Sequence, residues 1–101
     1  MTKIAVNNEE ALYSFLRDSV GLTRIAKGFL ETARLLERSK ARTVIIAANV
    51  VPPDRLDVIR ALSERKGVRI LIVSDKRRLG KAVGLDVGAS CVALPAEVEL
   101  T

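Results

Sequence analysis

The sequence predicts a single-domain α/β protein, a three-layer α/β/α sandwich around a small mixed sheet. The chain has 101 residues, enough for one domain and too few for two ordinary ones. Segments with helical periodicity alternate with short apolar runs rich in β-branched residues, which are typical of strands covered on both faces. Right-handed crossovers between such strands place helices on both faces of the sheet. Because hydrophobic residues make up 49% of the chain and aromatic residues only 3%, the core should be aliphatic.

The first helix is expected to begin after an asparagine, either Asn7 or Asn8. Two glutamates follow, and acidic residues in the first turn favour the helix macrodipole. Apolar residues then recur at helical spacing until Ser19. Gly21 stands where a glycine in the left-handed conformation often follows a helix, so we expect the helix to end near Ser19.

A short extended connector over residues 22–27 leads to Gly28, and a second helix is expected over Phe29–Ser39. On a helical wheel its apolar stripe is centred on Thr32, which should face the sheet. Leu30 falls on the charged side and should be exposed. It either contacts a base or a partner protein, or has no role, since isolated exposed apolar residues are common.

The second half of the chain continues the alternation. Thr43–Ala48 is a β-branched run without polar alternation, which predicts a central parallel strand. Prolines and Asp54 open a third helix, which Gly67 ends. The remaining expected elements are a second buried strand over Val68–Val73, a short basic helix over Asp75–Val83, a third strand over Ser90–Leu94 and a peripheral tail after Pro95.

The composition excludes most catalytic chemistry. Histidine is absent and Cys91 is the only cysteine, so a multi-ligand zinc site and the Cys–His or Ser–His catalytic pairs cannot be assembled. The carboxylates have helix-cap or helix-face explanations. Gly80, Gly84 and Gly88 follow no strand, so they do not form a dinucleotide-binding fingerprint. We therefore expect a protein that is not an enzyme and has no metal or other cofactor.

The cysteine content, the start of the chain and the length of the apolar runs also indicate where in the cell the protein is located. A single thiol allows no intrachain disulfide, which fits a reducing cytoplasm, and no export pattern is apparent near the start of the chain. The longest apolar runs fall far short of the roughly 18 residues that crossing a bilayer requires. We expect a cytoplasmic protein without a membrane partner.

The charge distribution points to an anionic partner such as nucleic acid. Of the net charge of +5, +4 lies within residues 24–42, where six cations face two glutamates. A helix start preceded by Gly28 offers free N–H groups and a positive dipole to a phosphate, with Lys27 nearby. The alternative is a solvated helix face held by Glu–Arg pairs, of which Glu31–Arg34 is one.

A second candidate surface is the loop around Leu85–Gly88, which mixes apolar residues with glycine. In the alternative interpretation its valine and leucine fold back into the core. This loop and the first basic segment must converge if they form one site. The cluster Lys76–Arg78 adds further positive charge, although such residues can merely solvate a helix.

Two long stretches, with the helix and strand between them, resemble the ribosomal protein superfamily that joins the L7Ae, L30e and S12e families. They are KGFLETARLLERSKARTVIIAANV at residues 27–50 and RLGKAVGLDVGASCVAL at residues 78–94. The resemblance covers about residues 8–94. It implies an α/β/α sandwich that binds RNA, often kink-turns, in ribosomes and small RNA–protein particles.

The motif G-x-N-E-x-x-K of kink-turn binders falls on the start of the second helix. Gly28 and Glu31 match it, and Arg34 keeps the charge of its lysine. Leu30 replaces the asparagine whose amide reads sheared purine pairs, and a leucine side chain cannot make those hydrogen bonds.

The other RNA-facing loop of that superfamily, L/I-E-V-G-A, resembles residues 85–89. Its apolar residues would pack against an extruded base. The S12e branch has GL or GI before its second helix and a V-G-C-S-C-V ending, which Gly28–Glu31 and Val87–Val92 resemble. An apolar residue at Leu30 fits that branch better.

The resemblance implies a non-catalytic ribosomal or ribonucleoprotein protein that docks structured RNA, expected to be ribosomal RNA, in the cytoplasm with the ribosome. Other ribosomal or ribonucleoprotein proteins are further expected partners. The expected RNA-binding residues are Arg24, Lys27, Gly28, Phe29, Leu30, Glu31, Arg34, Arg38, Leu85, Asp86, Val87, Gly88 and Ala89. The alternative is a protein-interaction module of the same fold that has lost kink-turn RNA binding.

Overall fold

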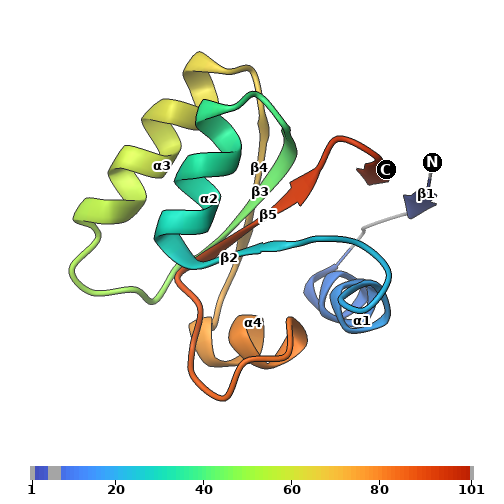
Figure 1. The fold of residues 1–101 in the computed structure, drawn as a ribbon. Coiled ribbons are helices and arrows are strands. Elements are labelled where there is room, and N and C mark those ends of the chain that lie inside the picture. The colour runs from blue at the N-terminus through green and yellow to red at the C-terminus, as the bar shows by residue number, and fades with distance from the viewer. Residues whose placement is uncertain (1, 5–7, 101) are drawn as a thin grey trace.

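Helices and strands alternate along the residues that the structure, a computed structural model, describes, which are 2–4 and 8–100 (Figure 1). In chain order the elements are β1 (Thr2–Ile4), α1 (Glu9–Ser19), β2 (Ala26–Lys27), α2 (Gly28–Glu37), β3 (Ala41–Ala47), α3 (Asp54–Arg65), β4 (Arg69–Val73), α4 (Lys76–Ala82), β5 (Cys91–Pro95) and β6 (Val98–Leu100).

The main sheet has four strands in the order β2-β5-β3-β4. β3 runs parallel to β4 and antiparallel to β5, and β2 runs antiparallel to β5. The predicted mixed sheet is therefore confirmed, with β3 in its interior. β1 and β6 form a separate parallel pair.

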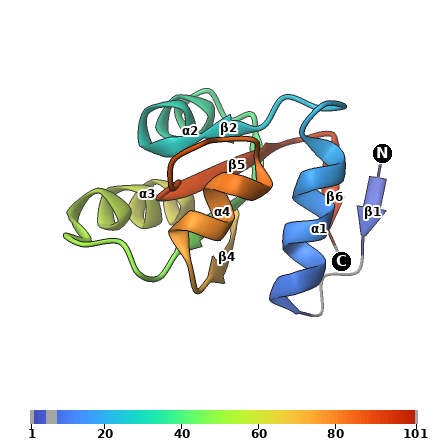
Figure 2. The same ribbon diagram turned by 90° about the horizontal axis from the view of Figure 1, so that it is seen from below.

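Two helical layers cover the main sheet, with α2 and α3 on one face and α1 and α4 on the other (Figures 1 and 2). Successive side chains of a strand point to opposite faces. Along β3, Val44 and Ile46 accordingly pack with α2 and α3, whereas Ile45 and Ala47 pack with α1 and α4. The predicted three-layer sandwich with an aliphatic core is confirmed.

The start of α1 agrees with the prediction from the sequence, but the residues that follow the end of the helix do not. The Asn8 side chain accepts a hydrogen bond from the Ala11 N–H at 2.7 Å, as an N-cap should. Asn7 lies outside the described residues. Gly21 was expected in the left-handed conformation, yet it is not among the glycines with positive φ. The C-cap residue is Val20, with a right-handed backbone, and the N–H groups of Leu22 and Thr23 donate to the carbonyl of Ser19, which closes the helix end without a left-handed glycine.

The second helix starts one residue earlier and ends two residues earlier than the expected Phe29–Ser39. Ser39 adopts a left-handed φ of 57°, which ends the helix. The Lys66 ammonium donates to the carbonyl of Glu37 at 3.3 Å and to the Ser39 hydroxyl at 3.0 Å, so a cation satisfies acceptors at this helix end.

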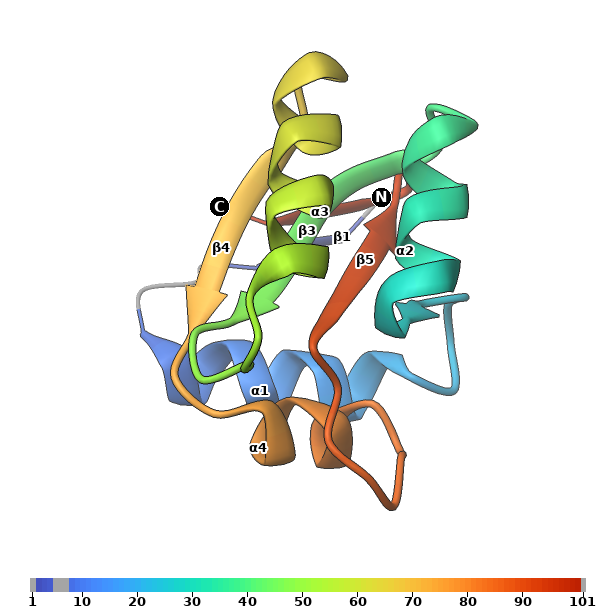
Figure 3. The same cartoon turned by 90° about the vertical axis from the view of Figure 1, so that its left-hand side faces the viewer.

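The strand expected to be buried over Val68–Val73 is instead the edge strand β4 (Figure 3). Its side chains are mostly half-buried or exposed, and Ile72 is 54% exposed. A continuous apolar run is compatible with an edge as well as with a centre, so the sequence alone did not distinguish the two.

The tail after Pro95 was expected to be peripheral, and this is wrong. A short turn leads to β6, which pairs with β1. The side chain of Val98 is buried in the core cluster that includes α1 and α4. The other predicted elements end within about two residues of the observed ones, an ordinary uncertainty of helix and strand bounds.

Candidate nucleic-acid interface

Strand pairing brings the two predicted surfaces to the same end of the sheet. Lys27 of β2 lies opposite Val92 of β5, so Gly28 follows β2 where the chain enters β5. Cys91 in turn lies opposite Ile46, at the carboxyl end of β3. Figures 1 and 2 both show the segment that enters β5 passing beside the start of α2. The start of α2 and the segment after the 85–89 loop therefore converge, as a single site requires.

The start of α2 has free N–H groups of the kind that bind anions. Gly28 has a φ of +84°, a conformation that favours glycine, and turns the chain from β2 into the helix. The N-cap residue Lys27 makes no side-chain capping bond. The Lys27 backbone N–H donates to the Glu31 carboxylate at 3.3 Å, which holds that carboxylate near the helix start.

Exposed apolar side chains stand on both segments. Leu30 is 63% exposed, as predicted, and Val87 is 71% exposed. Thr32 is fully buried on the opposite side of α2, which confirms the helical wheel. Hydrophobic side chains in water beside backbone donors are suited to stack on or pack against an unpaired base.

The 85–89 loop is held tightly against α4. The Ala89 N–H donates to the carbonyl of Lys76 at 2.9 Å, and the Leu85 N–H donates to that of Gly80 at 2.9 Å. A Cβ on Gly80 would lie 2.1 Å from the carbonyl oxygen of Val87. The loop is therefore positioned by backbone contacts that only a glycine permits.

Not every predicted loop residue presents its side chain to solvent. Ala89 is buried and Leu85 is half-buried against the core, whereas Asp86, Val87 and Gly88 are exposed. The alternative that both apolar residues fold back thus applies to Leu85 and not to Val87. Leu85 and Ala89 support the loop from inside.

The predicted cations lie along one flank of α2. Arg24, Arg34 and Arg38 line an open groove of about 790 Å³ between α2 and the turn that joins β5 to β6. Glu31 and Lys40 also line it. Within the described ranges, none of these three arginines forms an ion pair, so the alternative of a helix face held by Glu–Arg pairs does not apply.

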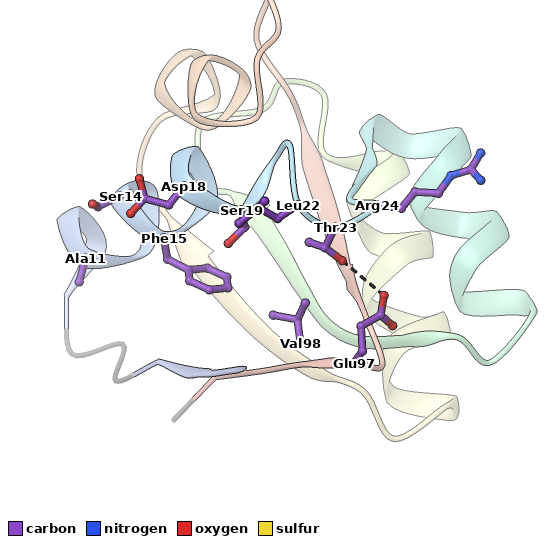
Figure 4. A pocket seen from close by; sticks show the side chains of 10 residues that line it. All are labelled: Ala11, Ser14, Phe15, Asp18, Ser19, Leu22, Thr23, Arg24, Glu97 and Val98. Atoms are coloured by element: carbon purple, nitrogen blue, oxygen red, sulfur yellow. Dashed lines mark hydrogen bonds between the residues drawn. The ribbon is translucent and has the colours of Figure 1, made fainter. Parts of the chain in front are cut away.

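Arg24 separates this groove from a second hollow of about 760 Å³ beside α1 (Figure 4). That hollow is lined by apolar and polar side chains, and a hydrogen bond of 3.3 Å from the Thr23 hydroxyl to Glu97 crosses one end. In Figure 4 the Arg24 guanidinium points away from the hollow and toward α2. Its charge therefore adds to the α2 flank.

Two residues that the sequence did not single out lie at the same end of the sheet. The Arg55 guanidinium, in the first turn of α3, stacks over the ring of Phe29 at 5.3 Å from its centroid. Val51, in the loop between β3 and α3, is exposed. Both follow the carboxyl end of β3. Ligands of α/β sheets often bind at the carboxyl ends of strands, and this rule could have singled out Arg55 and Val51 from the sequence.

The described residues give little indication of metal binding, thiol reactivity or membrane insertion. Among the described residues no group of three His, Cys, Asp or Glu side chains is placed to hold a metal ion. Cys91 is buried, as predicted, and burial raises the pKa of its thiol above the ordinary value. No described helix combines the length and the apolar character needed to cross a membrane.

The fold and this end of the sheet match a known class of proteins. The chain belongs to the ribosomal protein L7Ae/L30e/S12e/Gadd45 family, whose sequence profile matches residues 10–99. Among solved structures it is similar to a 15.5 kD RNA binding protein of Giardia lamblia, with a TM-score of 0.80 and 28% sequence identity. The match covers 87% of this chain and 76% of the Giardia chain. The resemblance stated from the sequence is confirmed.

Proposed function

We propose that this protein binds structured RNA, without catalysing a reaction, at the surface formed by the start of α2 and the 85–89 loop. The observation that carries the proposal is the β2–β5 pairing, which joins the Gly28 helix start and the exposed Val87 at one end of the sheet. Membership of a ribosomal protein family supports it, as does the similarity to a protein named for RNA binding.

Different residues would supply affinity and specificity. Arg24, Lys27, Arg34 and Arg38 would contact phosphates, a contribution that weakens as salt rises. Leu30 and Val87 would contact an unstacked base. Gly28 allows the RNA backbone to approach, and Glu31 stays at the helix start through its bond to the Lys27 N–H.

The particular RNA belongs to the same proposal. We propose ribosomal RNA as the ligand, a kink-turn as its form, and association with ribosomes in the cytoplasm as the setting. The ribosomal membership of the family supports this choice. Crosslinking the tagged protein in cells and sequencing the bound RNA tests it: one ribosomal junction is expected, and scattered messenger RNA would contradict it.

A gel-shift titration of Arg34→Glu tests the site. Arg34 is exposed and has no ion pair among the described residues, so the fold should tolerate the change. Binding to a structured RNA should weaken at least tenfold, because a phosphate contact becomes a repulsion. Arg65→Glu, the same charge change on the far end of α3, should have a much smaller effect. Unchanged affinity of Arg34→Glu at moderate ionic strength would count against this site.

A protein-interaction module is the second candidate, and one observation favours it. Leu30, Val51 and Val87 are all exposed at the same end of the sheet, and clustered apolar side chains are typical of protein contacts. Such a module would bind both ribosomal and kink-turn RNA only at nonspecific, salt-sensitive levels. The same titrations therefore separate the two candidates.

A further inference from the structure

The hollow beside α1 (the α1 hollow) lies next to the proposed RNA surface and has a different chemistry. It has a volume of about 760 Å³ and is formed by α1, the connector that follows α1, and the start of β6 (Figure 4). This volume lies within the range of roughly 300–1,000 Å³ that is usual for ligand-binding clefts. The α1 hollow is therefore large enough to take up part of another molecule.

The floor of the α1 hollow is apolar. The side chains of Phe15 and Val98 line it, and both belong to the core cluster that α1 and α4 share. Leu22 lines it from the connector and is 88% exposed, the largest exposed fraction among the large hydrophobic residues that the structure describes. An exposed leucine beside an apolar floor is typical of a surface that a partner covers.

Two carboxylates flank this apolar floor. Asp18 belongs to α1, and Glu97 belongs to the turn between β5 and β6. In Figure 4 the side chains of Phe15 and Val98 lie between them. The hollow thus presents an acidic group, an apolar floor and a second acidic group in that order.

Within the described parts of the chain, no cation pairs with either carboxylate. Arg24 also lines the α1 hollow, but its guanidinium points away from it and toward α2. Glu97 accepts the hydrogen bond from the Thr23 hydroxyl through one oxygen, and its second oxygen can accept more. The hollow is therefore acidic on a chain whose net charge is +5, so it repels phosphate and attracts a cationic partner.

The position of Asp18 does not favour the stability of the fold. Asp18 is exposed and is the penultimate residue of α1. The last turn of a helix carries the negative end of the dipole, which repels a carboxylate, and aspartate is a poor helix former. Residues that oppose local stability in this way are typical of functional positions. Asp18 therefore points to a role outside the fold.

We propose that the α1 hollow binds a segment of another protein in which lysine or arginine residues flank apolar ones. The apolar side chains of the segment would cover Leu22 and the floor of the hollow, and its cations would pair with Asp18 and Glu97. The basic–apolar–basic order of such a segment matches the acidic–apolar–acidic order of the hollow. RNA does not fit, because both carboxylates repel its phosphates.

The source of the segment rests on the proposed function, whereas the chemistry of the hollow does not. Proteins that bind the same RNA must also neutralise phosphates, so they carry lysine and arginine in quantity. The partner we propose is such a neighbouring protein on the same RNA. Binding of the segment itself requires no RNA and is measured without it.

Asp18 separates the two surfaces experimentally. Glu97 and Arg24 line both the α1 hollow and the groove on the α2 flank, whereas Asp18 lines the hollow and not the groove. A change at Asp18 therefore tests the hollow and leaves the proposed RNA surface intact.

An NMR titration of the isotope-labelled chain with the peptide Lys-Lys-Leu-Leu-Lys-Lys tests the proposal. Resonances around Asp18, Leu22 and Glu97 should shift at up to millimolar peptide. The peptides Lys-Lys-Ser-Ser-Lys-Lys and Glu-Glu-Leu-Leu-Glu-Glu should each bind at least tenfold more weakly, because one lacks the apolar contact and the other meets repulsion. Absent shifts, shifts confined to the start of α2 and the 85–89 loop, or equal binding of the serine peptide would overturn the proposal.

Asp18→Lys should weaken binding of the leucine peptide at least fivefold, because an attraction becomes a repulsion. Its melting temperature should not fall, because a cation suits the end of a helix. Glu64→Lys is the matched control: Glu64 is exposed and is the penultimate residue of α3, on the opposite face of the sheet. This control should change the affinity less than twofold. Equal effects of the two variants, or no effect of Asp18→Lys, would overturn the proposal.

The same variants distinguish this proposal from the proposed function. Asp18→Lys should not weaken RNA binding, whereas Arg34→Glu should weaken it. If the leucine peptide binds as expected and Arg34→Glu leaves RNA affinity unchanged, the RNA site is wrong and the hollow stands. If adding RNA alone shifts the resonances around Asp18 and Leu22, the hollow belongs to RNA and this proposal is overturned.

Discussion

At the proposed RNA-binding surface, Leu30 would determine how a base is read. Its side chain is exposed at the start of α2, where the resembling motif has an asparagine, and it offers no donor or acceptor. Hydrogen bonds to a base would there have to come from Glu31 and from the backbone N–H groups of the first turn. We infer that Leu30 contributes apolar contact, while its neighbours contribute polar recognition.

Leu30→Asn is expected to strengthen binding to a kink-turn RNA. A side-chain amide can bond two groups of a base, and such a pair contributes about 1–3 kcal/mol of discrimination. An RNA of equal length without the kink should gain nothing. Isothermal titration with both RNAs measures the difference, and Leu22→Asn, at an exposed leucine outside the proposed site, is the control. Equal gains for both RNAs would argue against base reading at this position.

At the scale of elements, the contact between α4 and the 85–89 loop links stability to the proposed site. Gly80 lies inside α4, where a Cβ would overlap the Val87 carbonyl oxygen. Gly88 lies next to Lys76, and a Cβ on Gly88 would be 3.2 Å from the lysine side chain. The position of Val87 therefore depends on a glycine seven residues earlier.

Gly80→Ala should lower the free energy of unfolding by about 1–3 kcal/mol, the usual cost of overpacking. It should also weaken RNA binding, because the loop must move away from α4. Urea unfolding and a gel shift measure the two effects. Gly21→Ala is the matched control, because nothing lies within 4 Å of its added Cβ and its φ is not in the left-handed region. A stable Gly80→Ala with unchanged binding would show that the close approach is dispensable.

The elements also show what the sequence can predict and why. Local signals such as the Asn8 cap and the Thr32 stripe predicted α1 and α2, because they depend on neighbours along the helix. The edge position of β4 depends on which strands pair with it, and an apolar run in the sequence does not identify those partners. The Arg55–Phe29 contact likewise joins two helices far apart in sequence. The sequence required the two surfaces to converge if they form one site, but could not show that they do. The β2–β5 pairing brings them to the same end of the sheet.

At the scale of the whole molecule, each core layer contains one buried acid that titrates in alkaline solution. Cys91 packs with α2 and α3, and Tyr13 packs with α1 and α4. Burial raises the pKa of the Cys91 thiol above 9.0. Burial, and next the charge of Glu9, raise the pKa of the Tyr13 phenol above 10.0. Burial in the core therefore favours the protonated forms of the Cys91 thiol and the Tyr13 phenol.

Stability should fall in alkaline solution. The unfolded chain ionises at the ordinary pKa values and the folded chain only at higher ones, so this stabilisation is complete below pH 9.0 and is lost as the pH rises through the raised values. Urea midpoints at about pH 8 and about pH 10, either side of the ordinary thiol pKa, measure the loss. Cys91→Ala should lose less between the two conditions. An equal loss in that variant would exclude a contribution from the thiol.

The pairing of β1 with β6 has a practical consequence. β5 begins at the proposed interface and ends at the turn before β6, so the two-stranded sheet lies at the far end of the main one. Figures 1 and 2 show β1 and β6 lying there. A fluorophore, an affinity handle or a fused domain attached beyond β1 or β6 would thus lie away from the Gly28 helix start and the 85–89 loop, and a copy tethered to a sensor surface would present that end of the proposed RNA surface to solution.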